Sequence, residues 1–582
     1  MIRTNKKKLS RLFIIDGYIP KIFLAGIIGL CTGIVAILFH YGLEISSDFI
    51  RNFFTTNKNI SKEWFALMPA LGGLIVGLIL FKITKTPEAA GQGTDNMIYA
   101  FHHQGGKVRK RVAPVKFITS IITLSSGGSA GYEGPMSQIG SGIANMIAGL
   151  FKMPRKVKGL FTLAGTAAGL GAIFKAPLAG ALTSVEVLYR EDFESGAFLT
   201  SIVSSVVAFS VYISFVGISP AIGGVPDFPF TNAKDLLVSA LLGLFCIPFS
   251  FLYASAYFKS ESVFKNLKIK TFLKPALGGL FVGGIILVFP EVAGGGFEFI
   301  GTLLHNFLPT SFFGVFILIG IVLAKILATA LTVGSGGSGG VFGPSLFIGG
   351  VLGAAFGGGI ELLFPHLLEH PETMILIGMG AFFAGAAKAP IAGVIMVCEM
   401  TGSYSLLPGL LIASVTHIAF SRKWSIYKNQ VLNKFHSPAH KGDMNTDILR
   451  EFLIKDVIKQ QKIHKLDLND SIFQIKNLID EKTIYLVFHK EKYAGILDTS
   501  ILQTILFASP EVLNHLLLSD CYVKAPILLD SMDLHSATKV FLRTGLSALP
   551  VKDKTGSVTG ILNYSDILKT YDLCLKNIRS FH

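Results

Sequence analysis

The sequence predicts an all-α, polytopic membrane domain followed by a small soluble α/β domain. Of the 582 residues, 51% are hydrophobic and only 15% are charged, whereas soluble globular proteins carry about 25% charged residues. Uncharged apolar runs of about 20 residues, long enough to cross a bilayer, recur through the first three quarters of the chain. After about Lys434 the composition becomes polar and these runs stop. A water-soluble enzyme does not fit this composition.

The apolar runs differ in length and continuity. The clearest are residues 22–39, 197–218 and 236–258, whereas others, such as 373–387, are short or interrupted by glycine. Irregular backbone survives at membrane depth only where protein buries it or where it lines a polar cavity. We therefore expect about ten to a dozen crossings of the bilayer, several of them built from broken half-helices.

The formal net charge of +15 fits a membrane protein, because Lys and Arg gather in cytoplasmic segments. The N-terminus, MIRTNKKKLSRLF, follows that pattern and is too basic to be a cleaved signal peptide. We expect cytoplasmic termini, an inner or plasma membrane location and no nucleic-acid partner. The five cysteines are far apart and form no CxxC motif, so neither a disulfide framework nor a metal site is expected.

A pair of matched motifs indicates an internal repeat. The stretch SGGSAGYEGPMSQIG at 126–140 matches SGGSGGVFGPSLFIG at 335–349, at an offset of 209 residues. Downstream, KAPLAGALTSVEV at 175–187 matches KAPIAGVIMVCEM at 388–400, at an offset of 213 residues. Two matched blocks in the same order predict a duplicated unit. Such duplications in transporters often enclose a midplane site made of broken helices.

The two matched stretches at 126–140 and 335–349 each contain a glycine-rich loop that ends in a Gly-Pro pair, Gly134-Pro135 and Gly343-Pro344. Proline favours the first helical position, so we predict a helix starting just after each loop. A buried helix N-terminus presents free N–H groups and the positive end of the helix dipole. Two or three such ends would bind an anion, and neither loop carries a Lys or Arg that would hold it too tightly. A small anion is the inferred substrate; close helix packing is the other use of such glycines.

These motifs resemble those of the CLC family of chloride channels and chloride/proton antiporters. GYEGP at 131–135 resembles the family's GREGP, GVFGP at 340–344 its GxFxP, and GQGTD at 91–95 its GSGIP. SIYKNQ at 425–430 resembles the segment that bears the family's pore tyrosine. The resemblance implies the CLC fold with two inverted repeats, transport of chloride, and a homodimer in the lipid bilayer whose subunits each have a pathway.

The resemblance assigns Glu133 as the gating glutamate. A carboxylate in an anion-binding loop competes with the anion while it is ionised and releases the site when it is protonated; a helix N-terminal cap is the structural alternative. Phe342 and Tyr427 align with the two aromatic residues that line the anion. Gly134 and Val341 are expected to contribute to the anion site, Val341 through its backbone N–H.

Three positions in these motifs depart from the family. Gln92 takes the place of the central serine, and its amide can still donate an N–H to an anion, which leaves the anion selectivity open. Asp95 stands where the family has proline. Tyr132 replaces the usual arginine beside the gating glutamate.

A fourth departure bears on protons. Many antiporters carry two adjacent glutamates after the APLAG motif, and the second transfers the proton; here the pair is Glu186-Val187. Valine carries no proton, so we predict passive, channel-like chloride flow, with Glu186 as a structural hydrogen-bonding residue. A chloride/proton antiporter is the alternative, because some antiporters lack the internal glutamate.

Two other classes of protein fit less well. A CBS-regulated cation transporter would need acidic residues in the membrane, and the pore loops offer Glu133 and Asp95 only. A membrane enzyme would need a reactive motif, but the apolar region contains no HExxH, no GxSxG and no paired carboxylates. We expect no catalytic residues.

The chain divides into three parts. Residues 1–434 form the membrane domain, with repeat halves at about 20–220 and 235–430. Residues 435–450 form a polar linker, and 451–582 alternate β-like runs with helical patterns.

The tail resembles a pair of regulatory CBS domains, most clearly in LSALPVKDKTGSVTGILNYSDIL at 546–568. CBS pairs often bind adenine nucleotides, with an aspartate on the ribose. Asp566 occupies that place, whereas the equivalent position of the first repeat is Ile501. Adenine-nucleotide binding and a purely structural, dimerising tail both remain open; no other cofactor is expected.

Overall fold

The computed structural model describes residues 18–56, 62–222, 233–306, 309–421, 423–440, 449–458, 463–475, 484–490, 492–497 and 516–580. The basic N-terminal segment, residues 441–448 of the predicted linker, and Ile501 lie outside the described residues. The chain separates into two compact units, Met1–Ala439 and His440–His582.

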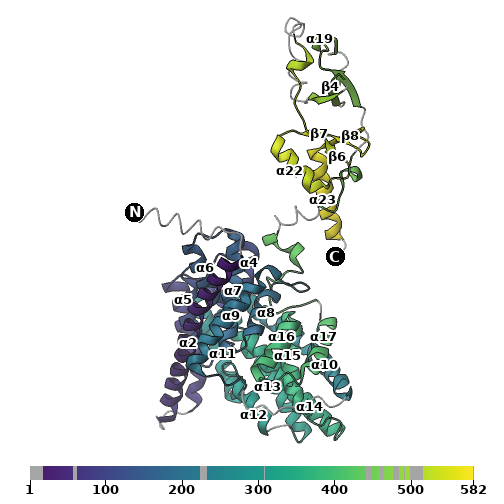
Figure 1. Ribbon diagram of the computed structural model, residues 1–582. Coiled ribbons are helices and arrows are strands. Elements are labelled where there is room, and N and C mark those ends of the chain that lie inside the picture. Colours follow the sequence, from purple (N-terminus) through teal and green to yellow (C-terminus); the bar gives the residue numbers. More distant parts are fainter. Residues whose placement is uncertain are drawn as a thin grey trace. The chain divides into compact units, whose positions relative to one another are not determined.

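The first unit is a bundle of helices (Figure 1). The helices described in its first half are α2 (Tyr18–Thr56), α3 (Met68–Gly77), α4 (Gly93–Gln104), α5 (Val112–Ser125), α6 (Glu133–Leu150), α7 (Arg155–Ile173), α8 (Pro177–Glu186) and α9 (Ser195–Val216). Those described in its second half are α10 (Ala233–Asn266), α11 (Lys274–Val288), α12 (Phe297–Asn306), α13 (Phe312–Gly334), α14 (Phe342–Leu363), α15 (Thr373–Ala387), α16 (Pro390–Thr401) and α17 (Leu407–Phe420). Short helical turns connect them: η1 (Lys62–Leu67), η2 (Leu78–Ile83), η3 (Pro87–Ala89), η4 (Thr271–Leu273), η5 (Pro290–Val292), η6 (Lys434–His436) and η7 (Pro438–His440).

The two halves repeat one order of elements, as the duplicated motifs predict. In the first half α7 packs against α6 and α9, and in the second half α15 packs against α14 and α17. The halves also interlock, because α3 packs against α11 and the short strands β1 (Gly91–Gln92) and β2 (Ser338–Gly339) pair with each other.

The duplicated KAP motif makes the same sharp break in both halves. After α7 the backbone turns at Lys175, with φ 53°, and after α15 it turns at Lys388, with φ 59°. This left-handed conformation ends a helix. The proline two residues later starts the next helix, at Pro177 and at Pro390, where its missing N–H costs nothing.

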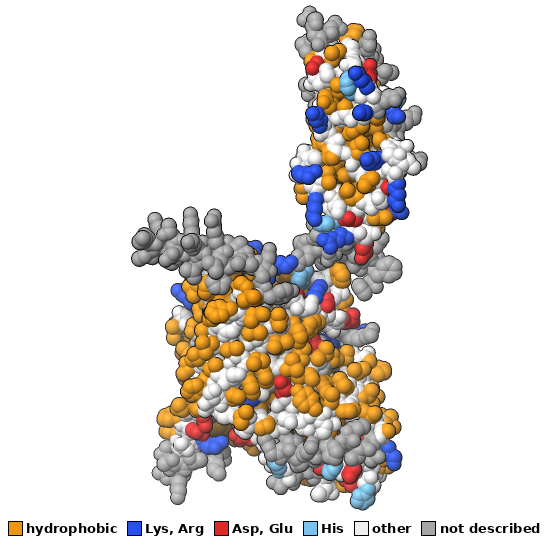
Figure 2. Space-filling view, in the orientation of Figure 1, with side chains coloured by type: hydrophobic (Ala, Val, Ile, Leu, Met, Phe, Trp, Pro, Cys, Tyr) orange, Lys and Arg blue, Asp and Glu red, His pale blue; other side chains and the backbone are white. Residues whose placement is uncertain are grey.

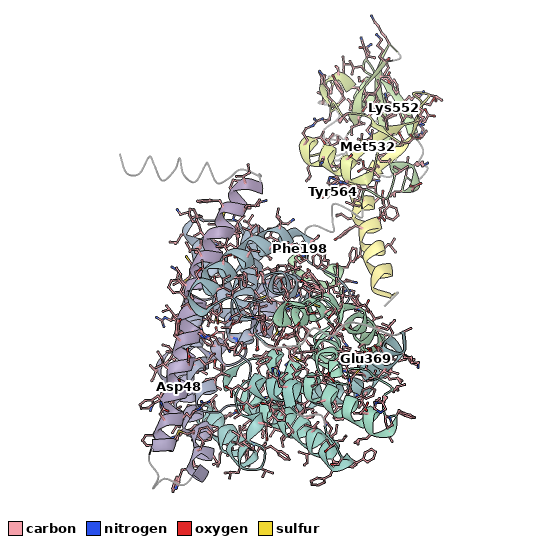
Figure 3. The ribbon with its side chains drawn as sticks, turned by 60° about the horizontal axis from the view of Figure 1, so that its bottom comes forward. Asp48, Phe198, Glu369, Met532, Lys552 and Tyr564 are labelled. Atoms are coloured by element: carbon pink, nitrogen blue, oxygen red, sulfur yellow. The ribbon has the colours of Figure 1, made fainter. Side chains whose placement is uncertain are left out.

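The outer surface of the helical unit suits a bilayer. Figure 2 shows hydrophobic side chains over most of its visible face. The exposed carboxylates Asp48 and Glu369, labelled in Figure 3, lie near the C-terminal end of α2 and in the segment after α14.

Among the described residues, seven helices are long and apolar enough to cross a membrane. They are Ile19–Phe53, Trp64–Ile83, Ser195–Val216, Ala233–Asn266, Thr271–Val288, Phe312–Gly334 and Phe342–Leu363. Shorter apolar helices of 10–17 residues include Val112–Ser125, Thr373–Ala387, Pro390–Thr401 and Leu407–Phe420. At 1.5 Å per residue a helix of that length falls short of a hydrocarbon core about 30 Å thick. These are the half-helices expected from the sequence.

The second unit is an α/β fold with two small sheets, in agreement with the predicted tail. Its elements are β3 (Ile463–Asp467), β4 (Ile484–His489), β5 (Lys492–Leu497), β6 (Leu528–Leu529), β7 (Ala548–Lys552), β8 (Val558–Asn563), α19 (Ile472–Ile475), α22 (Leu534–Thr544), α23 (Tyr564–Ser580), η8 (Ile454–Asp456) and η10 (Leu518–Asp520). The sheets have the orders β3-β4-β5 and β6-β7-β8. In each sheet the first two strands are parallel and the last two antiparallel, so the tail also repeats one topology.

Candidate functional site

Three glycine-containing loops of the helical unit meet through backbone hydrogen bonds. Gly131 and Gly340 pair antiparallel, and each N–H donates to the other carbonyl at 2.8 Å. In the neighbouring pairing, β1 and β2 join Gly91 to Ser338 and Gln92 to Gly339 in parallel register. Both pairings connect the first half to the second, and they bring the N-termini of α4, α6 and α14 together. Converging N-termini favour an anion.

Glycine is required where these helix starts touch. A Cβ on Gly134 would lie 2.7 Å from the Cα of Gly340, closer than real Cβ atoms approach, and a Cβ on Gly93 would overlap the carbonyl oxygen of Gly134. Any larger residue at these positions would push the helix N-termini apart. The glycines therefore serve close packing and the convergence of N-termini at the same time.

Glu133 is the first residue of α6 and is fully buried. Its Oε2 accepts a hydrogen bond of 3.1 Å from the backbone N–H of Gly343, in the first turn of α14. Its Oε1 is buried and has no hydrogen-bond partner among the described residues. The carboxylate thus occupies an N-terminal position of the opposite helix, where an anion would bind. Pro135 is the third residue of α6, so the helix begins two residues before the predicted proline start.

Gln92 and Tyr427 both carry buried polar atoms that lack partners among the described residues. These atoms are Nε2 and Oε1 of Gln92 and the hydroxyl oxygen of Tyr427. The two residues are 4% and 1% exposed. Leaving such groups unpaired costs about 1–3 kcal/mol each. Donors held without a protein acceptor suit a transient anion ligand.

Asp95 connects the loop of Gln92 to the segment of Tyr427. Its Oδ1 accepts the backbone N–H of Asn429 at 2.9 Å, and its Oδ2 accepts the Asn429 side-chain amide at 2.8 Å. This departure from the family's proline therefore has a structural use. It fixes the tyrosine-bearing segment against the first turn of α4.

Phe342 and Val341 occupy the start of α14. The ring of Phe342 packs on Phe174 and Phe383, with ring centroids 5.1 and 3.9 Å apart. The Val341 carbonyl accepts a hydrogen bond of 2.8 Å from the hydroxyl of Tyr253. These contacts hold Phe342 as an apolar wall beside the Glu133 carboxylate, which reaches the N–H of the next residue.

The internal proton position is apolar. Val187 is fully buried at the C-terminal end of α8. Its carbonyl accepts a hydrogen bond of 3.1 Å from the side-chain amide of Gln430, three residues after Tyr427. No titratable side chain therefore occupies this position.

The neighbouring Glu186 is one of two reciprocal helix caps. It accepts the N–H of Ala392, in the first turn of α16, at 2.7 Å, and Glu399 accepts the N–H of Ala179, in the first turn of α8, at 2.8 Å. Each carboxylate also accepts the preceding N–H at 3.2 Å. The two glutamates are separated by the repeat offset of 213 residues. Glu186 thus makes the hydrogen bonds that its predicted structural role requires.

Two buried lysines were not anticipated. Lys116 in α5 donates to the carbonyl of Gly91 at 2.7 Å, and Lys325 in α13 donates to that of Gly294 at 2.8 Å. Both are fully buried, and neither forms an ion pair with a carboxylate in the described parts of the chain. Their separation equals the repeat offset of 209 residues, a signal that could have revealed them. Both lysines thus tie helices to loop carbonyls in a region whose anion-binding loops carry no cation.

Two pockets adjoin the site. The Tyr427 pocket, of about 480 Å³, is lined by Tyr427, Trp424, Phe258 and nearby charged residues. The Tyr132 pocket, of about 700 Å³, is lined by Tyr132 and the segment 290–299, among others. Tyr132 precedes Glu133. The centroid of its ring lies 6.1 Å from the ring centroids of both Phe174 and Phe297.

In the C-terminal unit, Asp566 lies in the first turn of α23. Its Oδ2 accepts a hydrogen bond of 3.1 Å from the side-chain amide of Asn563, and Lys569 lies 3.9 Å from its Oδ1. The carboxylate is 14% exposed.

Comparison with known proteins decides the family. The profile of the family described as voltage gated chloride channel matches residues 72–422. The chain belongs to this CLC family. The CBS domain profile matches residues 522–572, and together these matches confirm the predicted CLC fold with a CBS tail.

Similar CLC proteins are named as exchangers. The H(+)/Cl(−) exchange transporter ClcA of Salmonella agona is 32% identical over 412 residues, covering 67% of this chain and 83% of the relative. That of Vibrio cholerae serotype O1 is 29% identical over 413 residues, covering 69% and 86%. The crystal structure of a slow cyanobacterial Cl−/H+ antiporter matches with a TM-score of 0.62 at 27% identity, covering 70% of this chain and 96% of that one. As a CLC protein, the chain is a multi-pass membrane anion transporter.

Proposed function

We propose that this CLC protein conducts chloride through the site between α4, α6 and α14, with Glu133 as the gate. The observation that carries the proposal is the Glu133 carboxylate on the N–H of Gly343. A carboxylate held at a helix N-terminus occupies the place that a chloride ion would take. Gln92, Tyr427, Val341, Phe342 and the α6 start at Gly134 complete the site.

Chloride selectivity tests this proposal. In Gln92→Ser the amide donor is replaced by a hydroxyl with a shorter reach, so we expect the chloride-to-nitrate preference to change by about threefold to tenfold, or about 0.6–1.4 kcal/mol for one altered hydrogen bond. The measurement is competitive anion flux in reconstituted liposomes. Gln104→Ser, at the C-terminal end of α4, is the matched control and should leave the preference unchanged. Equal selectivity in Gln92→Ser and the parent would place Gln92 outside the site.

Passive flow is the proposed mode, because Val187 offers no proton acceptor and the carboxylate of Glu186 is engaged by two backbone N–H groups. Chloride/proton antiport is the second candidate. It is favoured by the exchanger names of the relatives, and would have to carry protons between Glu133 and the Tyr427 side without a carboxylate at position 187.

The family resemblance also supports a homodimer in the inner or plasma membrane, with cytoplasmic termini. The apolar outer face of the helical unit (Figure 2) supports the bilayer as its surroundings.

The tail is proposed to bind an adenine nucleotide through Asp566. Addition of ATP should then increase the free energy of unfolding of the full-length protein by RT ln(1 + [L]/Kd), about 2.7 kcal/mol at a hundredfold excess over the dissociation constant. Its melting temperature should rise as a result. Asp566→Ala should remove the part of this stabilisation that comes from the tail, whereas Asp553→Ala, in the exposed turn between β7 and β8, should retain it. An unaltered melting temperature in the parent would leave the tail structural.

A further inference from the structure

The wall of the Tyr427 pocket is positively charged. Four cationic residues from three separate segments line it: Arg190 after α8, Lys265 in the last turn of α10, and Lys423 and Lys428 on either side of Tyr427. One carboxylate, Glu261, lines the same pocket. No histidine lines the pocket, so the four cations and the one carboxylate give its wall a net charge of +3.

These cations form no close ion pair in the described parts of the chain, with Glu261 included. In addition, Nε of Arg190 is buried and has no hydrogen-bond acceptor among the described residues. A guanidinium N–H removed from water and left unpaired is costly, and an anionic oxygen is its natural acceptor.

The pocket is large enough for an organic ligand. Its volume of about 480 Å³ lies in the range of sites for drug-sized ligands, about 300–1,000 Å³. Two aromatic side chains, Trp424 and Phe258, form part of the wall. Trp424 is held in place by an edge contact with Phe251, with ring centroids 5.2 Å apart. A rigid indole beside several cations can accept a planar ring while the cations bind phosphate oxygens.

The Tyr132 pocket offers a contrast within the same molecule. It is larger, about 700 Å³, but its charged lining residues are Arg51, Glu291 and Glu298, with a net charge of −1. A polyanion would be repelled there. Size alone therefore does not distinguish the two pockets; charge does.

We propose that the Tyr427 pocket binds a soluble organic anion that carries both a planar ring and several phosphate groups, of the nucleoside triphosphate class. The site is separate from Asp566 in the tail. Because Tyr427 lies in the pocket wall and also in the proposed anion site, a polyanion bound in the pocket obstructs chloride beside Tyr427. The consequence for anion flow rests on the proposed function, whereas the binding itself does not.

Binding is tested with ATP on the full-length protein in detergent, in the Asp566→Ala background, by titration calorimetry with EDTA present. We expect ATP to bind, and the double variant Lys265→Gln/Lys423→Gln to weaken binding at least tenfold. Lys265→Arg/Lys423→Arg should restore it, and Arg51→Gln, in the Tyr132 pocket, should leave it unchanged. Inorganic triphosphate should bind more weakly than ATP, and adenosine should not bind measurably. Chloride flux without ATP shows that each variant is folded.

Three results would overturn the inference. They are no ATP binding in the Asp566→Ala background, equal binding by the double glutamine variant, and equal affinity for ATP and for a soluble short-chain phosphoinositide. The last would assign the pocket to a lipid headgroup. In liposomes, ATP should slow chloride flux in the Asp566→Ala protein and act at least tenfold more weakly on the double variant. Binding without slowing would place the ligand clear of the pathway; absence of chloride flux in the parent would instead contradict the proposed function.

Discussion

Replacing Glu133 by glutamine is expected to remove the pH dependence of chloride flux. In the parent, lowering the pH protonates the carboxylate and frees the N–H of Gly343 for chloride, so flux rises as the pH falls. A single titrating group changes flux by up to about tenfold per pH unit. Glutamine is neutral at every pH, so flux through Glu133→Gln should be constant between pH 5 and pH 8, over about three orders of magnitude in proton concentration. It should be close to the flux of the parent at the acidic end of this range.

The measurement is chloride efflux from proteoliposomes at a series of pH values. Glu133→Asp keeps a carboxylate at the same position and should retain a pH-dependent profile. Glu191→Gln, an exposed site after α8, controls for reconstitution and should behave as the parent. A pH profile that persists in Glu133→Gln would reject Glu133 as the gate.

Glu186→Ala should lower the stability of the helical unit and leave its anion selectivity unchanged. The substitution leaves the buried N–H of Ala392 and the partly buried N–H of Ile391 without their carboxylate, which costs about 2–3 kcal/mol because hydrogen bonds to charged groups are involved. The midpoint of thermal unfolding in detergent should fall. Glu399 makes the equivalent contacts with the start of α8, but these are more exposed to solvent. Glu399→Ala should therefore cause a smaller fall, because water can replace the lost acceptor.

Glu186→Gln separates this role from proton transfer. Glutamine keeps one acceptor oxygen, so its melting midpoint should lie between those of the parent and Glu186→Ala. The chloride-to-nitrate preference of the surviving protein should match the parent. A normal melting midpoint in Glu186→Ala, combined with altered pH dependence, would indicate a proton relay instead of a helix cap.

Local patterns made the fold predictable from this sequence. The KAP motif and the Gly-Pro loops act through backbone rules, so the helix breaks at Lys175 and Lys388 follow from a few adjacent residues. The repeat then predicted that two halves would share one architecture. The family resemblance named Glu133 and Phe342 as site residues, and in the structure each begins a helix directly after its loop.

Contacts between distant residues were not predictable in the same way. Asp95 accepts hydrogen bonds from a residue 334 positions away, and nothing near it in the sequence identifies that partner. Lys116 and Lys325 were not anticipated from the sequence, and only their carbonyl acceptors show how the fold tolerates them. The four cations of the Tyr427 pocket are likewise assembled by tertiary structure from three separate segments.

The most direct test of passive flow is chloride movement in liposomes under a proton gradient. Chloride is equal on both sides at the start, and valinomycin with matched potassium clamps the voltage to zero. With Val187 in place of a proton-carrying residue, the pH gradient should drive no net chloride movement, and an imposed chloride gradient should dissipate without accompanying protons. Net chloride movement driven by the pH gradient alone would contradict this account and establish a chloride/proton antiporter.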